Sequence, residues 1–328
     1  MASVPILIGS NWICILKNEC LYSQIFVDLK NGELSMKNVC FKQVDVFTSQ
    51  RYKGNPVAVV LQADGITDAE MQQIANWTNL SETTFVIAKT EKAADYRVRI
   101  FTPGSELPFA GHPTIGTAHA LIEAGLVIPT DGVVIQECGA GLIRLDVTVD
   151  AAGEQQIAFE LPKPKITPLD DAEINRLETS LGSPLLREFA PCLVDVGARW
   201  VVAQLSSAEA VLENRPALEP MKADNLQAKA TGVIIFGEYK DESASDVEVR
   251  AYAPACGVSE DPVCGSGNGA MAAFIRHTGQ TQYFGENVQA SQGLILGRAG
   301  IIHLNIQDEA IKVGGQAVTC IDGQITLP

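Results

Sequence analysis

The sequence predicts an α+β protein of two pseudo-symmetric domains, each a mixed, barrel-like β-sheet wrapped around one central buried helix. Three observations support this fold class. Along the chain, strand patterns outnumber helix patterns. Residues 106–125 recur without a gap as residues 260–279. The two most apolar helices are those within the two repeated segments, and a helix that is apolar all round is buried on every side.

The repeated segment consists of an acidic turn, a glycine-rich loop and a helix closed by a glycine. Matching residues occur at its start, loop and end: Glu106 with Glu260, Gly111 with Gly265, and Gly125 with Gly279. The strands upstream, 98–103 and 249–254, match as well. A long-period repeat of strand, turn, loop and buried helix indicates two halves of one fold rather than a solenoid.

Each glycine-rich loop leads into a helix N-terminus. Glycine lets backbone N–H groups approach a ligand closely, and a helix N-terminus concentrates unpaired donors and positive dipole. Two such units that face each other would aim two helix N-termini at one cleft. The sequence therefore predicts a site for a small carboxylate between the two halves.

Composition excludes several classes of partner. The net charge is -15, and no run of Lys or Arg occurs, so we expect no nucleic-acid binding. No apolar segment is long enough to span a bilayer, so we expect no membrane association. The eight cysteines show no C-x-x-C and no Cys/His spacing, which favours reduced thiols in the cytoplasm over disulfides or a metal site.

The chain divides into an extension and two lobes. Residues 1–35 fit poorly with the rest of the chain, and we interpret them as a misassigned start or a dispensable extension. The N-terminal lobe is expected at 36–165 and the C-terminal lobe at 166–316. The boundary follows from a proline-rich connector, which contains Pro162, Pro164 and Pro168.

Helix signals and apolar runs place the remaining elements. A capping box of Thr67 with Glu70 opens a helix, a second helix runs from about Asp170 to Leu181 and ends at Gly182, and a short one is expected near 207–214. Strands are expected near 39–46, 57–61, 85–88, 133–136, 142–149, 157–161, 192–196, 200–205 and 232–236, followed by short strands over 288–327.

Glu82 lies at the mouth of an apolar strand, among small hydroxyl residues. A carboxylate that enters a strand is either a solvated edge residue or a placed acid/base, and the residues alone leave both interpretations open. Asn55 has two interpretations as well, because Gly-Asn-Pro suits a plain turn and also a contact to substrate at the cleft floor.

Five motifs, in this order, resemble the PhzF family of phenazine biosynthesis, a branch of the diaminopimelate-epimerase-like fold. They are Gly54-Asn-Pro-Val-Ala-Val, Leu80-Ser-Glu-Thr-Thr-Phe-Val, Pro108-Phe-Ala-Gly-His-Pro-Thr, Glu260-Asp-Pro-Val-Cys-Gly-Ser-Gly, and Ser291-Gln-Gly with Gly297-Arg. The resemblance covers about Met36 to the C-terminus. It implies a cofactor-free, metal-free proton-transfer isomerase, often a homodimer, whose last strand (about 317–328) returns to the N-terminal lobe.

The resemblance also implies roles for single residues. Glu82 would be the general acid/base, while His112 and Asp261 would hydrogen-bond and orient the substrate. The carboxylate of the substrate would be bound by three residues at the two helix N-termini: Gly111, Gly265 and Ser266.

Cys264 departs from the family pattern, which usually has Thr at this position. The epimerase relatives carry one cysteine before each glycine-rich loop, where this chain has Ala110 and Cys264, so two-thiol epimerisation is not expected. Cys264 is either a near-isosteric replacement of Thr or a thiol whose pKa is lowered at a helix N-terminus. In the second case it would pair with Glu82 in an amino-acid epimerase or racemase. A non-catalytic homologue that binds small ligands is the remaining alternative.

Overall fold

The structure is a computed structural model that describes residues 8–9, 12–13, 37–149, 153–240 and 243–328. The short strands β1 (Ile8–Gly9) and β2 (Trp12–Ile13) pair with each other. The prediction that residues 1–35 form a misassigned start or an extension lies otherwise outside the described residues.

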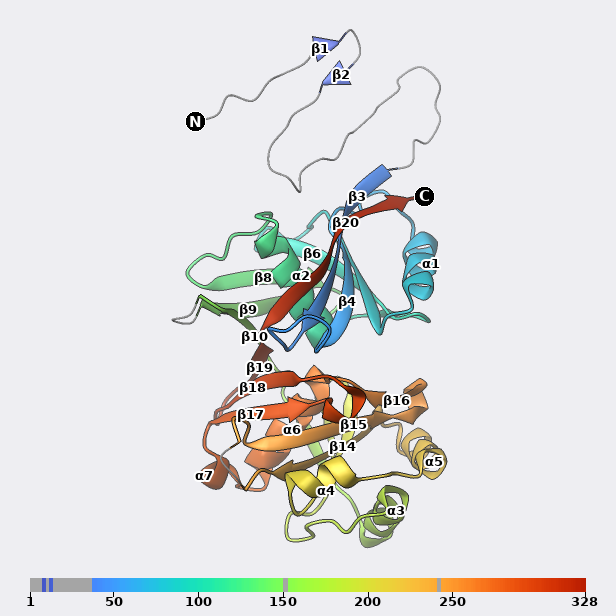
Figure 1. Cartoon of the computed structure of the whole chain (residues 1–328), viewed down its shortest axis with the longest axis vertical. Helices are drawn as coiled ribbons and strands as arrows, with labels where there is room; N and C mark the ends of the chain where they lie inside the picture. The colour runs from blue at the N-terminus through green and yellow to red at the C-terminus, as the bar shows by residue number, and fades with distance from the viewer. Residues whose placement is uncertain (1–7, 10–11, 14–36, 150–152, 241–242) are drawn as a thin grey trace.

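Two lobes lie one above the other along the long axis of the molecule (Figure 1). In each lobe a mixed sheet curves around one helix, α2 (Gly111–Glu123) in the N-terminal lobe and α6 (Gly265–His277) in the C-terminal lobe. The predicted fold class is therefore confirmed.

The sheet of the N-terminal lobe has the pairing order β3-β4-β5-β6-β8-β9-β10. Its β4–β5 and β6–β8 pairs are parallel, and the others are antiparallel. The strands are β3 (Lys37–Val46), β4 (Asn55–Val60), β5 (Glu82–Ile87), β6 (Tyr96–Phe101), β8 (Val133–Cys138), β9 (Gly141–Val149) and β10 (Gln155–Glu160), with β7 (Glu106–Leu107) beside β6.

The C-terminal lobe repeats this order as β12-β13-β14-β15-β17-β18-β19. Its parallel pairs, β13–β14 and β15–β17, fall at the same places. The strands are β12 (Cys192–Asp195), β13 (Arg199–Gln204), β14 (Gly232–Glu238), β15 (Val247–Ala253), β17 (Asn287–Gln292), β18 (Gly300–Ile306) and β19 (Ile311–Gly315), with β11 (Lys165–Pro168) beside β12 and β16 (Val258–Asp261) beside β15.

Two strand pairings join the lobes. β10 pairs with β19, and the last strand, β20 (Ala317–Leu327), leaves the C-terminal lobe and pairs antiparallel with β3 (Figure 1). The prediction of only short strands over 288–327 is wrong for β20, because β3 gives it a partner along its full length. The division at 165 falls on the first residue of β11, and the domain limits stay a prediction.

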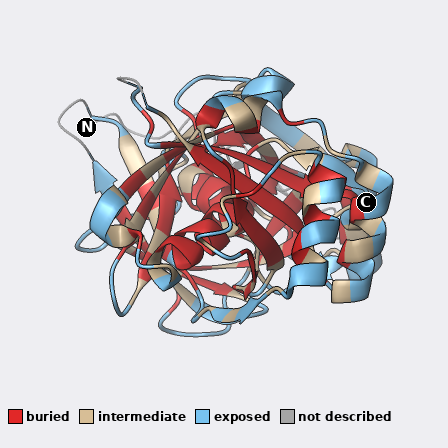
Figure 2. Cartoon of the chain, turned by 90° about the horizontal axis from the view of Figure 1, so that it is seen from below, coloured by how far each residue is buried: buried red, intermediate tan, exposed pale blue. Residues whose placement is uncertain are grey.

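The hydrophobic core extends through both lobes and encloses α2 and α6. Figure 2 shows buried residues concentrated in the strands and exposed residues on the outer helices. Large side chains of both central helices are fully buried, among them Ile115, Leu121 and Phe274. Helices that are apolar all round are buried on every side, as the sequence predicts.

The outer helices are α1 (Asp68–Thr78), α3 (Asp171–Leu181), α4 (Ala208–Glu213), α5 (Leu218–Ala228) and α7 (Thr281–Phe284), with the 3-10 turns η1 (Pro254–Cys256) and η2 (Leu294–Leu296). The predicted capping box of Thr67 with Glu70 is confirmed, and Gly182 caps α3 in the left-handed conformation. Sequence reasoning missed α5. Its Pro220 lies in the first turn, where a missing N–H breaks no helix hydrogen bond.

Candidate active site

The N-termini of the two central helices face each other where the lobes meet. A Cβ atom added at Gly265, the first residue of α6, would lie only 3.8 Å from the backbone nitrogen of His112 in α2. The two positive helix ends therefore flank one small region, and a carboxylate placed there would interact with both dipoles.

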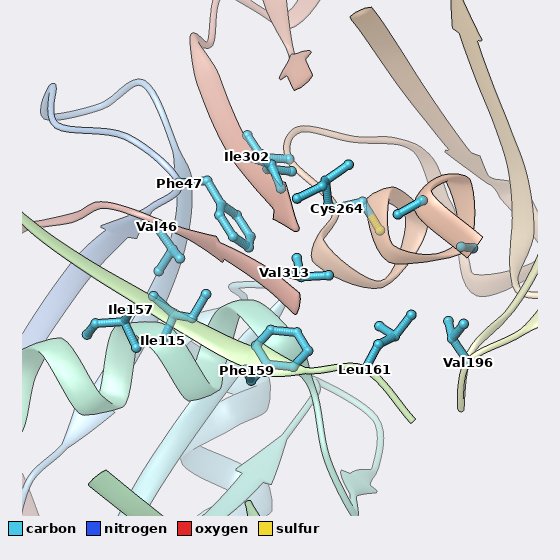
Figure 3. Close-up of a cluster of buried hydrophobic side chains, with 14 of the residues drawn as sticks. Val46, Phe47, Ile115, Ile157, Phe159, Leu161, Val196, Cys264, Ile302 and Val313 are labelled. Atoms are coloured by element: carbon cyan, nitrogen blue, oxygen red, sulfur yellow. The ribbon is translucent and has the colours of Figure 1, made fainter. Parts of the chain in front are cut away.

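Aromatic rings press against both helix ends and explain why glycine stands there. A Cβ at Gly111 would lie 2.7 Å from Cζ of Phe159, and one at Gly265 would lie 3.1 Å from Cζ of Phe47. Figure 3 shows both rings in the buried cluster that reaches Cys264 at the start of α6. Any side chain at Gly111 would push the ring away from the helix end.

Glu82 and His112 form the polar centre of this region. Glu82 is the first residue of β5, and its Oε2 atom lies 3.2 Å from Nε2 of His112. Both atoms are buried, and neither has a hydrogen-bond partner among the described residues. Buried polar atoms are normally paired, so these two are available to a ligand.

The surroundings shift the pKa values of both side chains. Burial, and to a lesser degree the negative charge of Asp261, raise the pKa of Glu82 to about 8. Burial lowers the pKa of His112 to about 3, although a hydrogen bond to the backbone of Pro56 opposes this shift. Proline has no N–H, so the imidazole donates to its carbonyl oxygen, and Nε2 stays an unprotonated acceptor. At neutral pH a carboxylic acid therefore faces a neutral imidazole.

Asp261 and Asn55 connect the lobes beside this pair. The Asn55 amide nitrogen donates to Oδ1 of Asp261 at 3.1 Å and to the carbonyl oxygen of Val263 at 2.9 Å. The Oδ1 atom of Asn55 is buried without a partner in the described part of the chain. Burial raises the pKa of Asp261 to about 6, because hydrogen bonds from Val263 and Cys264 offset only part of the desolvation.

Cys264 caps α6, and its thiol differs from the reactive form that a helix N-terminus favours. Its sulfur accepts a hydrogen bond from the backbone N–H of Gly267 at 3.3 Å, and the thiol donates to Asp261. Burial and the charge of Asp261 raise the pKa of Cys264 well above its usual value. This disfavours the alternative in which the helix N-terminus lowers the pKa of the thiol, because burial and the Asp261 charge outweigh the hydrogen bonds from Ser266 and Gly267.

Two further residues support the site, and sequence reasoning missed both of them. The Gln292 side chain accepts from the backbone N–H of Cys264 at 3.1 Å and donates to the carbonyl oxygen of Asp261 at 2.8 Å. The indole Nε1 of Trp200 donates to Oγ of Ser266 at 3.0 Å. Gln292 lies within the Ser-Gln-Gly motif, which was a signal for it. No local pattern marks Trp200.

The pseudo-symmetry places a different residue at each half of the site. Thr83 pairs with Phe101 and Val233 with Tyr252, and Phe101 and Tyr252 occupy equivalent positions of the repeat. The residues that precede Thr83 and Val233, Glu82 and Gly232, are therefore equivalent. A Cβ at Gly232 would overlap the carbonyl oxygen of Tyr252, so no carboxyl group fits there.

A groove of about 620 Å³ lies elsewhere, on the outer face of the strands where the lobes join. Its lining includes Asp146, His303 and Lys312 but none of the predicted site residues. Within the described ranges, no group of three or more His, Cys, Asp or Glu side chains is arranged to hold a metal ion, and no helix is long and apolar enough to cross a membrane.

The sequence matches the family PhzC-PhzF, described as phenazine biosynthesis-like protein, over residues 44–323. Antisense-enhancing sequence 1 of Schizosaccharomyces pombe is 42% identical, over 87% of this chain and 97% of its own. Trans-2,3-dihydro-3-hydroxyanthranilate isomerase of Pseudomonas fluorescens is 32% identical, over 87% of this chain and 98% of its own.

Solved structures agree at the level of the fold. The PhzF-family phenazine biosynthesis protein of Bacillus anthracis has a TM-score of 0.76 and 26% identity, over 88% of this chain and 99% of that chain. A hydroxyproline epimerase of Agrobacterium vitis has a TM-score of 0.58 and 14% identity, over 88% of this chain and 93% of that chain. The second likeness concerns the fold alone, and both agree with the predicted epimerase-like architecture.

Proposed function

This chain belongs to the PhzF family of phenazine biosynthesis-like proteins and is an enzyme of the isomerase class, and on that premise we propose that it moves one proton within a small carboxylic or amino acid without a cofactor. Glu82 is the acid/base, and His112, Asp261 and Asn55 orient the substrate. The substrate carboxylate binds at the two helix ends, next to Gly111, Gly265 and Ser266.

The observation that carries this proposal is the state of Glu82. Its pKa of about 8 lies close to neutral pH, where one side chain can both take and return a proton. A carboxyl group with its ordinary pKa of 4.5 would be a much weaker base. The carboxyl oxygen 3.2 Å from His112 also lacks a hydrogen-bond partner among the described residues, so it is free to meet the reacting carbon.

The two helix ends supply the stabilising charge. When a proton leaves a carbon next to a carboxylate, negative charge builds up on the carboxylate and the bonds conjugated with it. Backbone N–H groups and dipoles that already point at this position stabilise the charge without reorganising. The facing ends of α2 and α6 meet this requirement.

A single acid/base suits an isomerase better than a racemase. A racemase usually needs an acid/base group on each face of the substrate, whereas an isomerase can return the proton to the face from which it came. Here the position equivalent to Glu82 is Gly232, which leaves no room for a second acid. The buried thiol of Cys264 has a raised pKa and a partner in Asp261, which disfavours the mixed pair with Glu82.

We place this activity in the cytoplasm, on a small-molecule carboxylate, in a homodimer, without nucleic acid or membrane. The net charge of -15 and the scattered cysteines support this setting. Light scattering of the purified protein would test the dimer, since a molecular mass near 35.1 kDa would contradict it.

The decisive experiment follows solvent deuterium into a panel of small acids. The panel starts with trans-2,3-dihydro-3-hydroxyanthranilate, because two relatives are named for it, and continues with amino and hydroxy acids. We expect one acid to gain deuterium on a carbon as its double bond moves. Glu82→Gln should abolish this uptake, while the control Glu106→Gln, an exposed glutamate of the same lobe, should retain it.

Three results would contradict the proposal. Deuterium at a stereocentre without double-bond migration would indicate an epimerase. Full activity of Glu82→Gln would remove the proposed acid/base. Binding of an acid without any exchange would indicate a non-catalytic homologue.

A further inference from the structure

Trp200 is a buried tryptophan whose polar atom points at the candidate site. It lies in β13 and is 2% exposed, and its Nε1 donates to Oγ of Ser266 at 3.0 Å. A buried indole N–H needs an acceptor. Here the acceptor is a residue in the first turn of α6, where the substrate carboxylate is expected.

The same place in the N-terminal lobe holds the proposed acid/base. His112 and Ser266 are equivalent in the repeat, as are Glu82 and Gly232. Trp200 pairs in register with Gly232, and a Cβ at Gly232 would lie 2.8 Å from Cζ3 of Trp200. The indole therefore covers the position where the other lobe has a carboxyl group. Its N–H donates to Ser266, whereas the Glu82 carboxyl lies 3.2 Å from His112 without a hydrogen bond.

The indole fixes the direction in which Ser266 can donate. An indole N–H is a donor only, so the Ser266 oxygen accepts from Trp200 and its own hydrogen points elsewhere. The sulfur of Cys264, 3.6 Å away, is one available acceptor. It already accepts from Gly267, and sulfur is a weak acceptor. A carboxylate at the end of α6 would be a far better one.

We propose that Trp200 is a positioning residue that holds the Ser266 hydroxyl as a hydrogen-bond donor to the substrate carboxylate. It thereby sets how tightly the acid binds, and it takes no part in proton transfer. The inference rests on the proposed function, because it uses the carboxylate site assigned there.

The test is a double-mutant cycle. Trp200→Phe keeps an aromatic ring and removes the N–H, and Ser266→Ala removes the hydroxyl. Calorimetry in the Glu82→Gln background gives the Kd of trans-2,3-dihydro-3-hydroxyanthranilate without turnover. Ser266→Ala should raise this Kd about ten- to a hundredfold, the worth of one hydrogen bond to a charged group, and Trp200→Phe should raise it by no more than Ser266→Ala does. The double variant should be no weaker than Ser266→Ala alone. With Glu82 intact, Trp200→Phe should raise KM and leave kcat within about twofold.

Tyr252→Phe is the matched control. Tyr252 is a buried aromatic of the same lobe whose hydroxyl donates to Asn214 at 3.0 Å, away from the candidate site. Its loss should lower thermal stability and leave the Kd unchanged. If Trp200→Phe fails to fold, NMR of the protein with Trp200 unchanged gives a second test. The Trp200 indole N–H resonance is assigned by comparison with Trp12→Phe and Trp77→Phe. It should shift when the acid binds, and this shift should be lost in Ser266→Ala.

The outcomes separate this inference from the proposed function. An unchanged Kd in Trp200→Phe, effects that add in the double variant, or an indole resonance that ignores the acid would overturn the role of Trp200 alone. If Glu82→Gln turned over at the wild-type rate while the effects of Trp200→Phe and Ser266→Ala on Kd stayed non-additive, the acid/base would be overturned and the role of Trp200 would stand. Failure of every acid of the panel to bind would overturn both.

Discussion

The two lobes share one scaffold and differ in their chemistry. Strand order, parallel pairs and the buried helix occur at matching places in both. At the region where the helix ends meet, the equivalent residues differ: Glu82 with Gly232, His112 with Ser266, and Ala110 with Cys264. The comparison indicates that the repeated backbone supplies two positive helix ends, while the side chains of one lobe supply the proposed proton transfer.

A physical reason accounts for this division. A small anion gains from both helix dipoles, because their fields add at a point between them. An acid/base group is different, since a second one on the opposite face would let the enzyme invert a stereocentre. Glycine at position 232 and the indole of Trp200 leave no space for a carboxyl group at the position of the C-terminal lobe that is equivalent to Glu82.

The largest expected effect is a loss of kcat on substitution of Glu82 in the N-terminal lobe. Glu82→Gln keeps the shape of the side chain and cannot carry the proton, so kcat should fall about 10²- to 10⁴-fold. Steady-state kinetics on the acid found in the deuterium screen measures this loss. Unchanged far-UV circular dichroism would show that the fold is intact. A fall in kcat of less than tenfold would contradict the assignment of the acid/base to the N-terminal lobe.

The next effect is on stability in the C-terminal lobe. A Cβ at Gly232 would overlap the Tyr252 carbonyl oxygen, so Gly232→Ala should lower the free energy of unfolding by about 1–3 kcal/mol. Gly104→Ala is the control, because a Cβ there meets no atom within 4 Å. Denaturant titration of both variants measures the difference. Equal stability would mean that position 232 could have held a side chain.

The pH dependence sharpens the comparison further. The carboxylate form of Glu82 is the proposed base, so kcat/KM should rise about tenfold per pH unit below a midpoint near 8 and level off above it. The charge of Asp261 helps to raise this pKa, and Asp261→Asn should move the midpoint to lower pH. The midpoint, rather than the absolute rate, is the quantity to compare, because Asp261 is also proposed to orient the substrate.

The raised pKa of Glu82 also makes the free energy of unfolding depend on pH. The folded protein holds the Glu82 proton up to about pH 8, whereas an unfolded glutamate loses it near 4.5. The contribution of Glu82 to stability is therefore complete below pH 4.5 and is lost as the pH rises to about 8. Glu82→Gln should flatten this part of the curve of unfolding free energy against pH. An equally steep curve in the variant would assign the shift to another group.

The smallest expected effect is at Cys264. Its sulfur caps α6 and its thiol stays protonated, so Cys264→Thr should keep kcat within about twofold and lower stability by less than about 1 kcal/mol. Cys264→Ser should behave alike. A loss as large as that of Glu82→Gln in either variant would instead establish a mixed acid/base pair across the two lobes.

The sequence alone determined the elements that depend on neighbours along the chain. Thr67 with Glu70, and Asp170 with Gly182, mark helix ends because capping involves residues within one turn. The apolar composition of 270–275 requires burial wherever the helix lies. The repeat then made the two lobes predictable, and the family motifs marked Glu82, His112 and Asp261 as candidates.

Only the tertiary structure decided what those candidates can do. Asn55 donates a hydrogen bond to Asp261, which lies 206 residues away in the sequence, and Trp200 donates one to Ser266, which lies 66 residues away. The pKa values of Glu82 and Cys264 both rise because distant segments remove water from around them. Desolvation is a property of the assembled surroundings, so a local pattern such as a thiol at a helix end does not reveal it.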